Sequence, residues 1–328
     1  MKALILAGGQ GTRLRPLTLT RPKHLLPIAN QAHIDHVFDL FLTHGVNEAV
    51  LLTSYLAEHF KAVVPGAADR GLALEVVRET TPLDTAGALK NAGSSVTDGT
   101  FLAVNGDVLT RLDLRRLVDW HVQRGALATI ALTPVDDPSA YGVVVTEKDG
   151  RVTSFIEKPP AGTSPTNLIN AGAYVLEPEL LDWIPAGEPY SAERALFPAL
   201  VAAKAPVYAT GSDAYWMDIG TPPKLLEANR DALNGRFLTR AVAEPGPEAV
   251  AVAPDVRIEE GARVVRSCIG RGSALAEGAK VVGSVLLPGV EVGRGARVSG
   301  SILGEGVVVE PGAQVIDSTV ADERVVIG

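Results

Sequence analysis

The last third of the chain carries a repeat of 17 residues, and this feature restricts the fold more than any other. When residues 252–328 are stacked with a shift of 17, three columns contain only aliphatic residues. The columns are Val252, Ile269, Leu286, Leu303 and Val320; Ile258, Leu275, Val292, Val309 and Val326; and Val264, Val281, Val298 and Val315. Because the columns lie six, six and five residues apart, each repeat should present three apolar faces.

Glycine and serine recur at fixed places beside these columns, where they supply turn chemistry. The positions are Gly261, Gly278, Gly295 and Gly312, each followed by alanine, and Ser267, Ser284, Ser301 and Ser318. The pattern resembles the hexapeptide-repeat proteins, whose left-handed parallel β-helix stacks aliphatic side chains inward along a three-sided prism. The alternative is an antiparallel β-sandwich, although sandwiches do not repeat in such strict register. Cys268 lies next to an inward column, so we expect it to pack rather than to act as a nucleophile.

The first 235 residues instead alternate strand-like apolar runs with helical patterns. The runs are KALILA, EAVLLTS, LALEVVRE, TFLAVNGD and ATIALTPV. This alternation predicts βαβ units in a mostly parallel sheet that is covered on both faces and binds ligands at the carboxyl ends of its strands. Residues 141–177 show strands with little helix between them, which predicts an antiparallel excursion that adds a substrate wall. We therefore expect an α/β domain over residues 1–235, a linker over 236–251 and a β-helix of 17-residue coils over 252–328.

Composition excludes several kinds of partner. The formal net charge of −8 argues against a nucleic-acid surface, because binding to a phosphate backbone needs a concentrated basic stripe. No apolar run reaches membrane length, and the N-terminal run stops at Gly8, so we expect neither a signal peptide nor a membrane partner. Cys268 is the one cysteine and cannot form an internal disulfide, which suits a reducing compartment and predicts a cytoplasmic location.

A glycine-rich turn follows the first apolar run, in the segment LAGGQGTRLRPLT over residues 6–18. Glycines let backbone N–H groups approach phosphate oxygens closely. The spacing matches neither the Walker A pattern nor the dinucleotide pattern G-x-G-x-x-G, because Leu14 occupies the place of the third glycine. Arg13 and Lys23 add positive charge that would stabilise the negative charge growing on an α-phosphate in the transition state.

The string Gly-Gly-x-Gly-x-Arg-Leu-x-Pro-Leu-Thr, followed by Pro-Lys, resembles the signature of the sugar-1-phosphate nucleotidyltransferases. The resemblance implies a Rossmann-like catalytic domain, a Mg²⁺ ion, and in-line attack of a sugar phosphate on the α-phosphorus of a nucleoside triphosphate. It implies catalytic roles for Arg13, Lys23 and Asp107. The nucleotide-binding residues that it implies in and near the turn are Leu6, Ala7, Gly8, Gly9, Gly11, Thr12, Arg13, Lys23 and Gly106.

Two aspartates are candidate ligands for Mg²⁺. Asp107 follows a buried-looking run, and a carboxylate at the carboxyl end of a strand can hold Mg²⁺ beside a triphosphate. Asp218 matches the second metal position of the family. The structural alternatives are an Asn-Gly hairpin turn for Asp107 and a helix cap before Pro222 for Asp218. With the glycine-rich turn present, we favour metal binding for both.

A second group of residues matches the sugar-binding positions of the same family. Glu157 and Lys158 belong to an F-x-E-K-P segment, in which the glutamate accepts sugar hydroxyls and the lysine holds the sugar phosphate; a surface ion pair is the alternative. Gly142 and Asn170 match positions that line the sugar, although each alone would be an ordinary turn residue. The complete sugar set is Gly142, Glu157, Lys158, Asn170, Gly172 and Trp216.

The segment Glu79 to Gly87 resembles the base-reading loop E-x-x-P-L-G-T-A-G of mannose-1-phosphate guanylyltransferases. A carboxylate can only accept hydrogen bonds, so Glu79 suits the N1–H and amino groups of guanine, whereas thymidylyl- and uridylyltransferases generally place glutamine there. The alternative is a solvated Glu79 with the base read by backbone. Asp84 replaces the family glycine and puts the base in doubt, because its side chain could crowd the base or alter the turn. The expected contacts are Glu79, Pro82, Asp84, Thr85 and Ala86.

These matches favour GTP and mannose 1-phosphate as substrates and pyrophosphate as a product. The alternatives are a guanylyltransferase for heptose or a related sugar, a glucose-1-phosphate thymidylyl- or uridylyltransferase, and a non-catalytic nucleotide-sugar sensor. An added acyltransferase site would use histidine as base, but all six histidines precede the repeat, so we expect the β-helix to build a homo-oligomer. His33 and His36 have a metal-compatible spacing, yet we expect them on an exposed helix face.

Overall fold

The computed structural model describes residues 1–96 and 98–327, which form two compact units. The sheet unit comprises Met1–Gly9 and Val37–Trp216, and the β-helix unit comprises Gln10–His36 and Met217–Gly328. The glycine-rich turn is therefore divided. Its residues from Gln10 onward pack with the C-terminal part of the chain, a grouping that the domain limits expected from the sequence do not contain.

A nine-stranded sheet forms the sheet unit, with seven strands in the order β10-β9-β11-β6-β1-β4-β5 and β8 and β12 joined through β11. Its strands are β1 (Lys2–Leu6), β4 (Glu48–Thr53), β5 (Ala73–Arg78), β6 (Phe101–Asn105), β8 (Ala128–Pro134), β9 (Gly142–Thr146), β10 (Val152–Glu157), β11 (Leu168–Leu176) and β12 (Val207–Gly211). β1 runs parallel to β4 and β6, and β4 runs parallel to β5. β11 runs antiparallel to β6 and β8, and β9 pairs antiparallel with β10. The predicted βαβ series and its antiparallel excursion are confirmed.

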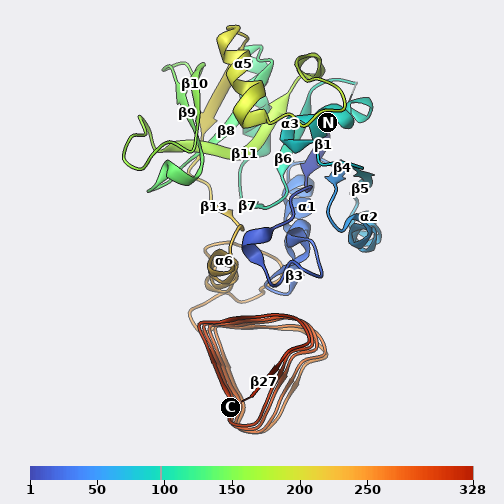
Figure 1. Ribbon diagram of the computed structural model, residues 1–328, viewed down its shortest axis with the longest axis vertical. Coiled ribbons are helices and arrows are strands. Elements are labelled where there is room, and N and C mark those ends of the chain that lie inside the picture. The colour runs from blue at the N-terminus through green and yellow to red at the C-terminus, as the bar shows by residue number, and fades with distance from the viewer. Residues whose placement is uncertain (97, 328) are drawn as a thin grey trace. The chain divides into compact units, whose positions relative to one another are not determined.

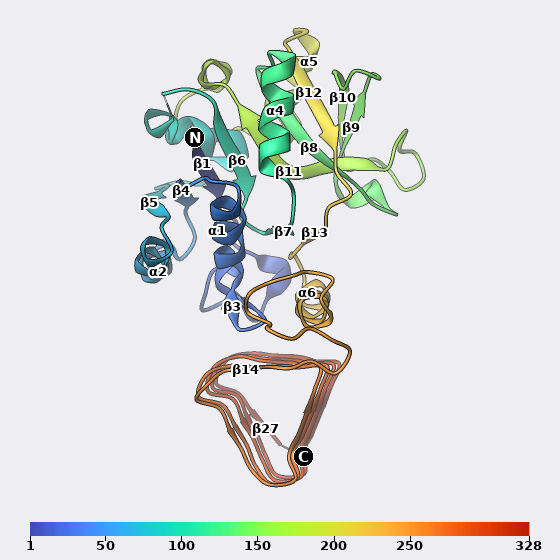
Figure 2. The same cartoon turned by 180° about the vertical axis from the view of Figure 1, so that it is seen from behind.

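Helices pack against both ends of this sheet. They are α1 (His33–Thr43), α2 (Val63–Asp69), α3 (Asp84–Asn91), α4 (Leu114–Arg124) and α5 (Phe197–Ala202), and α5 follows a π-helical turn at Ala192–Leu196. α4 lies in front of β8 and β11 in Figure 2. Its limits follow from the sequence, since the Asp113 carboxylate accepts from the Arg116 N–H at 3.0 Å and Gly125 ends the helix in a left-handed conformation with φ of 55°.

The repeat forms three stacks of short parallel strands, which Figure 1 shows as a triangular prism viewed along its axis. The first stack is β14 (Ala251–Val252), β17 (Cys268–Ile269), β20 (Val285–Leu286), β23 (Ile302–Leu303) and β26 (Thr319–Val320). The second is β15 (Arg257–Ile258), β18 (Ala274–Leu275), β21 (Glu291–Val292), β24 (Val308–Val309) and β27 (Val325–Val326). The third is β16 (Arg263–Val265), β19 (Lys280–Val282), β22 (Arg297–Ser299) and β25 (Gln314–Ile316). Each residue pairs with the residue 17 positions later, as between Ile269 and Leu286.

The predicted aliphatic columns form the core of the prism. Ile269, Leu286 and Leu303 are fully buried, and most of the other two columns packs against them, whereas Val252 and Ile258 of the first coil are exposed and lie outside this core. The serine column does more than turn the chain, because the hydroxyl of Ser267 accepts from the N–H of Ser284 at 3.0 Å and the pattern continues to the next coil. All pairings in the prism are parallel, so the β-sandwich alternative is wrong.

The remaining elements of the β-helix unit are the short strands β2 (Pro27–Ile28) and β3 (Gln31–Ala32) and the helix α6 (Pro222–Asn234). The strand β13 (Trp216–Asp218) joins the two units along the chain, and β7 (Val108–Thr110) belongs to the sheet unit. The segment expected to be a linker is packed at its start, because Phe237 is buried and its ring meets the ring of His36 edge-on at 5.4 Å.

Two sequence-based expectations about single side chains can be compared with the structure. Cys268 is completely buried, and its burial raises the pKa of the thiol to about 12 although an N–H of Ala29 acts in the opposite sense, so the packing role is supported. The exposed face expected for His33 and His36 is wrong, since both are buried and the Nε2 atom of His36 lies 3.1 Å from the Ile28 carbonyl oxygen. In residues 1–96 and 98–327, no helix has the length and apolar character needed to cross a membrane.

Candidate active site

The end of β1 lies against the ends of its neighbours β4 and β6. The Ala7 N–H donates to the Leu52 carbonyl at 2.8 Å, and the Gly106 N–H donates to the Leu6 carbonyl at 2.9 Å. The Ser54 hydroxyl donates to the carbonyl of Gly8 at 2.8 Å. These bonds fix the start of the glycine-rich turn at the carboxyl edge of the parallel strands, the edge where ligands are expected.

Glu79 follows β5 and faces this turn. A Cβ atom added to Gly8 would lie 3.6 Å from the Glu79 Oε2 atom, so the glycine leaves the approach to the carboxylate open. Glu79 is only 6% exposed, and the alternative of a solvated Glu79 is therefore wrong. Burial is the main cause that raises the pKa of Glu79; the N–H of Leu83 lowers it, and the charge of Asp84 raises it.

The loop after Glu79 is held by the segment before the π-helical turn. The N–H groups of Ala86 and Gly87 both donate to the Tyr190 carbonyl at 2.9 Å, and the Tyr190 N–H donates back to Leu83 at 2.9 Å. A Cβ atom on Gly87 would lie 2.8 Å from a carbonyl oxygen, so this close approach requires glycine. Pro82 lies exposed at the start of the loop. These backbone hydrogen bonds therefore hold the loop in shape.

Asp84 keeps the conformation that the family glycine would take. Its φ of 60° lies in the left-handed region, which aspartate tolerates because its side chain bonds locally. The Asp84 Oδ1 atom accepts from the Thr85 N–H at 2.8 Å, and its Oδ2 atom accepts from Arg194 at 2.6 Å. The two carboxylate oxygens of Asp84 thus bond within the loop and to the π-helical turn.

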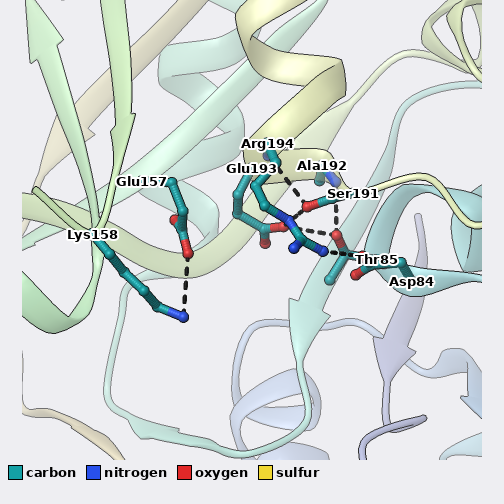
Figure 3. A network of polar contacts seen from close by, with 8 residues as sticks. All are labelled: Asp84, Thr85, Glu157, Lys158, Ser191, Ala192, Glu193 and Arg194. Atoms are coloured by element: carbon teal, nitrogen blue, oxygen red, sulfur yellow. Dashed lines mark hydrogen bonds and ion pairs between the residues drawn. The ribbon is translucent and has the colours of Figure 1, made fainter.

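A polar network joins this loop to the π-helical turn (Figure 3). The Thr85 hydroxyl donates to Glu193 at 2.8 Å and accepts from the Ala192 N–H at 2.7 Å. The Ser191 hydroxyl donates to the same Glu193 oxygen at 3.0 Å. We did not predict site roles for Ser191, Glu193 or Arg194, although their segment resembles the guanylyltransferases. No spacing rule links Thr85 with Glu193, which lies 108 residues later.

The network borders a cavity of about 460 Å³, and two of the residues predicted to bind the sugar also line this cavity. The lining residues are Asp84, Glu157, Lys158, Ser191, Glu193 and Arg194. Figure 3 shows Glu157 and Lys158 facing Glu193 and Arg194 across this space. The structure thus brings the base loop and the sugar wall, which the sequence predicted separately, to the same cavity.

The sugar wall is built from β9, β10 and β11. Glu157 pairs with Gly142, where an added Cβ atom would lie 3.0 Å from the Glu157 Oε2 atom. The Nζ atom of Lys158 lies 3.6 Å from Glu157, and the side chain of Lys158 is 66% exposed toward the cavity. Because Lys158 is so exposed, the pair contributes little to stability.

Asn170 and Gly172 lie in a strand and not in an ordinary turn. The register of β11 shifts between Asn170 and Tyr174, and Gly172 has a φ of 72° there. A Cβ atom on Gly172 would lie 2.7 Å from the Asn105 Nδ2 atom, so the irregularity lets β11 approach the end of β6. The Trp216 indole N–H donates to the Ala171 carbonyl at 2.9 Å.

Asp107 lies in the turn between β6 and β7. The turn is not a hairpin, because β6 pairs with β1 and β11 rather than with β7. The pKa of Tyr174 is raised well above its ordinary value. Burial of the hydroxyl is the largest cause, and the charges of Glu193, Glu157 and Asp107 raise this pKa further. Three carboxylates from distant parts of the sequence therefore lie near one buried hydroxyl.

The β-helix unit holds the rest of the predicted nucleotide residues. Gly11 has a φ of 64° and precedes a turn of 3-10 helix at Thr12–Leu14. The Thr18 hydroxyl donates to the Gly11 carbonyl at 2.8 Å, and a Cβ atom on Gly11 would lie 3.1 Å from the Cβ of Lys23. The glycine therefore lets Lys23 lie against the turn. Gly9, by contrast, is the last residue of the sheet unit before the division.

Arg13 and Asp218 meet inside the β-helix unit. Their charged groups lie 3.9 Å apart, and Lys224 of α6 lies at the same distance from Asp218. A Cβ atom on Gly220 would lie 2.7 Å from the Arg13 guanidinium, so Gly220 permits this approach. The helix-cap alternative for Asp218 is wrong, because the N-cap of α6 is Thr221. Lys224 is a cation of this cluster that we did not predict.

The donors present fit the Mg²⁺ ion that the family resemblance implies. Mg²⁺ is held in proteins through one or two carboxylates together with substrate phosphates and water. Asp107 of the sheet unit and Asp218 of the β-helix unit are each a carboxylate of this kind, and in the sheet unit the buried Oδ1 atom of Asn105 has no hydrogen-bond partner among the described residues. Within those residues no group of three His, Cys, Asp or Glu side chains is placed so that it could hold a metal ion.

Known protein families match most of this chain. Residues 2–235 match the family described as Nucleotidyl transferase, and residues 242–326 match the GlmU-like C-terminal hexapeptide family. A mannose-1-phosphate guanylyltransferase of Mycobacterium tuberculosis is 36% identical over 83% of this chain and 76% of its own length. A UTP–glucose-1-phosphate uridylyltransferase of Synechocystis is also 36% identical, over 76% of this chain and 67% of its own length.

A solved structure gives the same result for the fold. The structure of HddC from Yersinia pseudotuberculosis in complex with GMP-PN is similar to this chain, with a TM-score of 0.61 and 28% sequence identity. The similarity covers 70% of this chain and 98% of the HddC chain. The Nucleotidyl transferase family alone matches more than half of this chain. The chain therefore belongs to the nucleotidyl transferase family and carries a hexapeptide-repeat domain at its C-terminal end.

Proposed function

We propose that this protein transfers a nucleotidyl group from GTP to mannose 1-phosphate, giving GDP-mannose and pyrophosphate. The observation that carries the proposal is the buried Glu79 carboxylate beside the glycine-rich turn. A carboxylate has two acceptor oxygens and no donor, which complements the N1–H and amino group of guanine. A partly desolvated carboxylate with one long N–H contact also gains most from a ligand that brings donors.

In the proposed reaction an oxygen of the sugar phosphate attacks the α-phosphorus of the nucleotide. The bond from that phosphorus to the bridging oxygen of the β-phosphate breaks, and pyrophosphate leaves with the bonding electrons. Gly8, Gly9, Gly11 and Thr12 bring backbone N–H groups to the phosphates, and Leu6, Ala7 and Gly106 shape the strand ends below them. Arg13 and Lys23 stabilise the charge that grows on the α-phosphate.

Asp107 and Asp218 would hold Mg²⁺. When bound, this ion would neutralise phosphate charge and favour departure of the pyrophosphate. In the β-helix unit, the charged groups of Arg13 and Lys224 each lie 3.9 Å from Asp218.

The sugar phosphate is assigned to the cavity of about 460 Å³. Lys158 would hold the phosphate, Glu157 would accept hydroxyls of the sugar, and Asn170, Gly142, Gly172 and Trp216 would form the wall behind it. Pro82, Thr85 and Ala86 would contact the nucleotide from the fixed loop, which Glu193 and Tyr190 hold in shape. Reaction between two bound substrates is then a matter of orientation.

Two observations favour other substrates strongly enough to require a test. The uridylyltransferase relative is as identical as the guanylyltransferase, and the Asp84–Arg194 pair changes the loop that would read the base. Release of pyrophosphate should therefore be measured with GTP, ATP, UTP and dTTP, each with mannose, glucose and heptose 1-phosphates. We expect GTP with mannose 1-phosphate to give the highest kcat/KM. A preference for another base would overturn the assignment of Glu79, and release with no pair would favour a nucleotide-sugar sensor.

We also infer that the β-helix assembles the protein into a homo-oligomer and that the protein works in the cytoplasm. The β-helix exposes the apolar side chain of Val325, which is 61% accessible, and Cys268 is buried. Sedimentation equilibrium of the purified protein tests the assembly: a single species at the monomer mass would refute it.

A further inference from the structure

One outer face of the β-helix is covered by the segment that carries the glycine-rich turn. Cys268, Val285 and Ile302 alternate with the inward column and so point away from the prism, yet all three are at most 2% exposed. The Asn30 side chain donates to the carbonyls of Ala251 and Ile269, both at 2.9 Å. The first two coils thus bind the end of the segment Gln10–His36, inside one compact unit.

The last two coils bind the same segment nearer to the turn. The guanidinium of Arg21 donates to Glu305 and to Asp322, each at 2.8 Å. The Thr20 hydroxyl donates to the same oxygen of Asp322. The side chain of Arg21 is 16% exposed and that of Asp322 is 12% exposed, so the pair is shielded from water and should be stronger than an ordinary surface ion pair.

Asp322 is itself fixed in the β-helix. Its Oδ1 atom accepts from the Glu305 N–H at 2.8 Å, and a Cβ atom on Gly304 would lie 2.5 Å from that oxygen. A bare glycine one coil below therefore makes room for the carboxylate. The carboxylate joins two coils to each other with one oxygen and holds Thr20 and Arg21 with the other.

Lys23 lies two residues beyond Arg21, with Pro22 between them. Proline fixes its own φ and restricts the residue before it, so a constraint on Arg21 is transmitted to Lys23 with little freedom. On its other side Lys23 lies against Gly11, which Thr18 closes by a hydrogen bond. The position of the backbone and Cβ of Lys23 is therefore set from the turn and from the β-helix together.

We propose that Asp322 and Arg21 are positioning residues, through which the last coils of the β-helix hold Lys23 and the glycine-rich turn in the geometry that binds the triphosphate. The inference rests on the proposed function for its effect on turnover. It gives the β-helix a second role besides assembly: the C-terminal coil supports the nucleotide site of its own chain.

The test compares Asp322→Ala, Asp322→Asn and Arg21→Gln with Glu310→Gln, which removes an acidic charge at an exposed position of the same β-helix. Steady-state kinetics give kcat and KM for the nucleotide and for the sugar phosphate separately. Hydrogen exchange of the ligand-free protein gives the protection of the amides of residues 11–24, and this measurement does not depend on activity. The double variant Arg21→Gln with Asp322→Ala completes a cycle.

We expect Asp322→Ala and Arg21→Gln each to lower kcat/KM for the nucleotide about tenfold or more, since misplacement of a charged group by about 1 Å is costly. Exchange over residues 11–24 should rise while β19 and β22 stay protected, and the double variant should lose little more than either single one. Asp322→Asn, which keeps one acceptor oxygen but loses the charge, should fall between. Wild-type exchange over residues 11–24, or additive losses in the cycle, would overturn the inference.

The control separates the two proposals. Glu310→Gln should match the wild type in both measurements, and an equal loss in this variant would mean that any change of charge on the β-helix suffices, which contradicts the inference. A wild-type protein that releases no pyrophosphate would overturn the proposed function alone, because the exchange data would still report whether Asp322 holds the turn.

Discussion

The β-helix and the loops at the strand ends of the sheet are built by opposite rules. In the β-helix every coil repeats the contacts of the coil before it, and the bond from Ser284 to Ser267 recurs from Ser301 to Ser284. In the strand-end loops each contact occurs once. The bond from the Thr85 hydroxyl to Glu193, for example, joins residues that are 108 positions apart and does not recur at a fixed spacing.

The difference separates what each region can do. Because the contacts repeat, the stability of the β-helix is close to a sum over pairs of neighbouring coils. A local defect therefore lowers the stability of the β-helix but does not change which ligand is bound. Contacts made once fix the position of individual groups, so their loss should change chemistry more than stability. Arg21 and Asp322 lie where the two rules meet, because a regular coil there supports a loop that occurs once.

The largest effect is expected for Asp107→Asn in the strand-end turn. Loss of the carboxylate charge should lower kcat about 10²- to 10³-fold or more, because electrostatic groups at a transition state contribute at least that much. The unfolding midpoint should change little. Asp119→Asn on the exposed side of α4 is the control and should keep wild-type kcat. Pyrophosphate release and thermal unfolding are the measurements; a variant of Asp107 that turns over normally would remove it from the site.

Leu286→Ala tests the other side of the comparison. Leu286 is fully buried in the central coils, and truncation of a buried leucine costs about 2–5 kcal/mol of unfolding free energy. Because the contact is one of many alike, kcat measured well below the unfolding midpoint should stay within about twofold. Denaturant unfolding gives the free energy, and Lys280→Ala, at an exposed site of the preceding coil, should change it by no more than about 0.5 kcal/mol. A selective loss of kcat without loss of stability would contradict the distinction.

The same contrast explains how much the sequence predicts. The period of 17 fixes the register of the β-helix, and the columns through Ile269, Leu275 and Val281 are its core as expected. The alternation of strands and helices likewise predicts the sheet and the edge where the site lies. Both predictions depend on periodicity, which is a property of neighbours in sequence.

Contacts between distant residues leave no such signal. Arg21 and Asp322 are 301 positions apart, and no sequence motif links one residue to the other. Burial of His33 and His36 was missed for the same reason, because the short strand at Ile28 and the ring of Phe237 cover them from outside the helix. The left-handed conformation of Asp84 could be expected only from the glycine at that place in the family loop.

A smaller effect is expected on stability from Glu79→Gln, and it depends on pH. Burial raises the pKa of Glu79 in the folded protein above its ordinary value of 4.5, so the folded state favours the protonated form. The wild type should therefore lose stability as the pH rises from below 4.5 through the folded pKa, whereas the glutamine variant should not. At pH 7 the variant should be as stable as the wild type or more stable.

The expected change in kinetics does not depend on whether Glu79→Gln raises or lowers the stability of the protein. Glutamine offers both a donor and an acceptor, so Glu79→Gln should lower the preference for GTP over UTP. Thermal unfolding at a series of pH values and the ratio of kcat/KM for the two nucleotides are the measurements. Parallel pH profiles of wild type and variant would show that Glu79 is not desolvated as the structure places it.

The smallest effect is expected from Asp84, where two physical terms predict opposite signs. Its φ of 60° penalises alanine relative to glycine by about 1–2 kcal/mol. Helix propensity predicts the reverse, since Asp84 begins α3 and alanine is better than glycine inside a helix by about 1 kcal/mol. The first residue of a helix gains little from propensity, so the backbone term should dominate and Asp84→Ala should unfold at lower denaturant than Asp84→Gly. Loss of the partly exposed pair with Arg194 is common to both variants and cancels in the comparison. If the alanine variant proves the more stable, the loop does not keep the left-handed conformation at position 84. Helix propensity would then govern this position, as it governs the regular elements, and the single contacts of the base-reading loop would not.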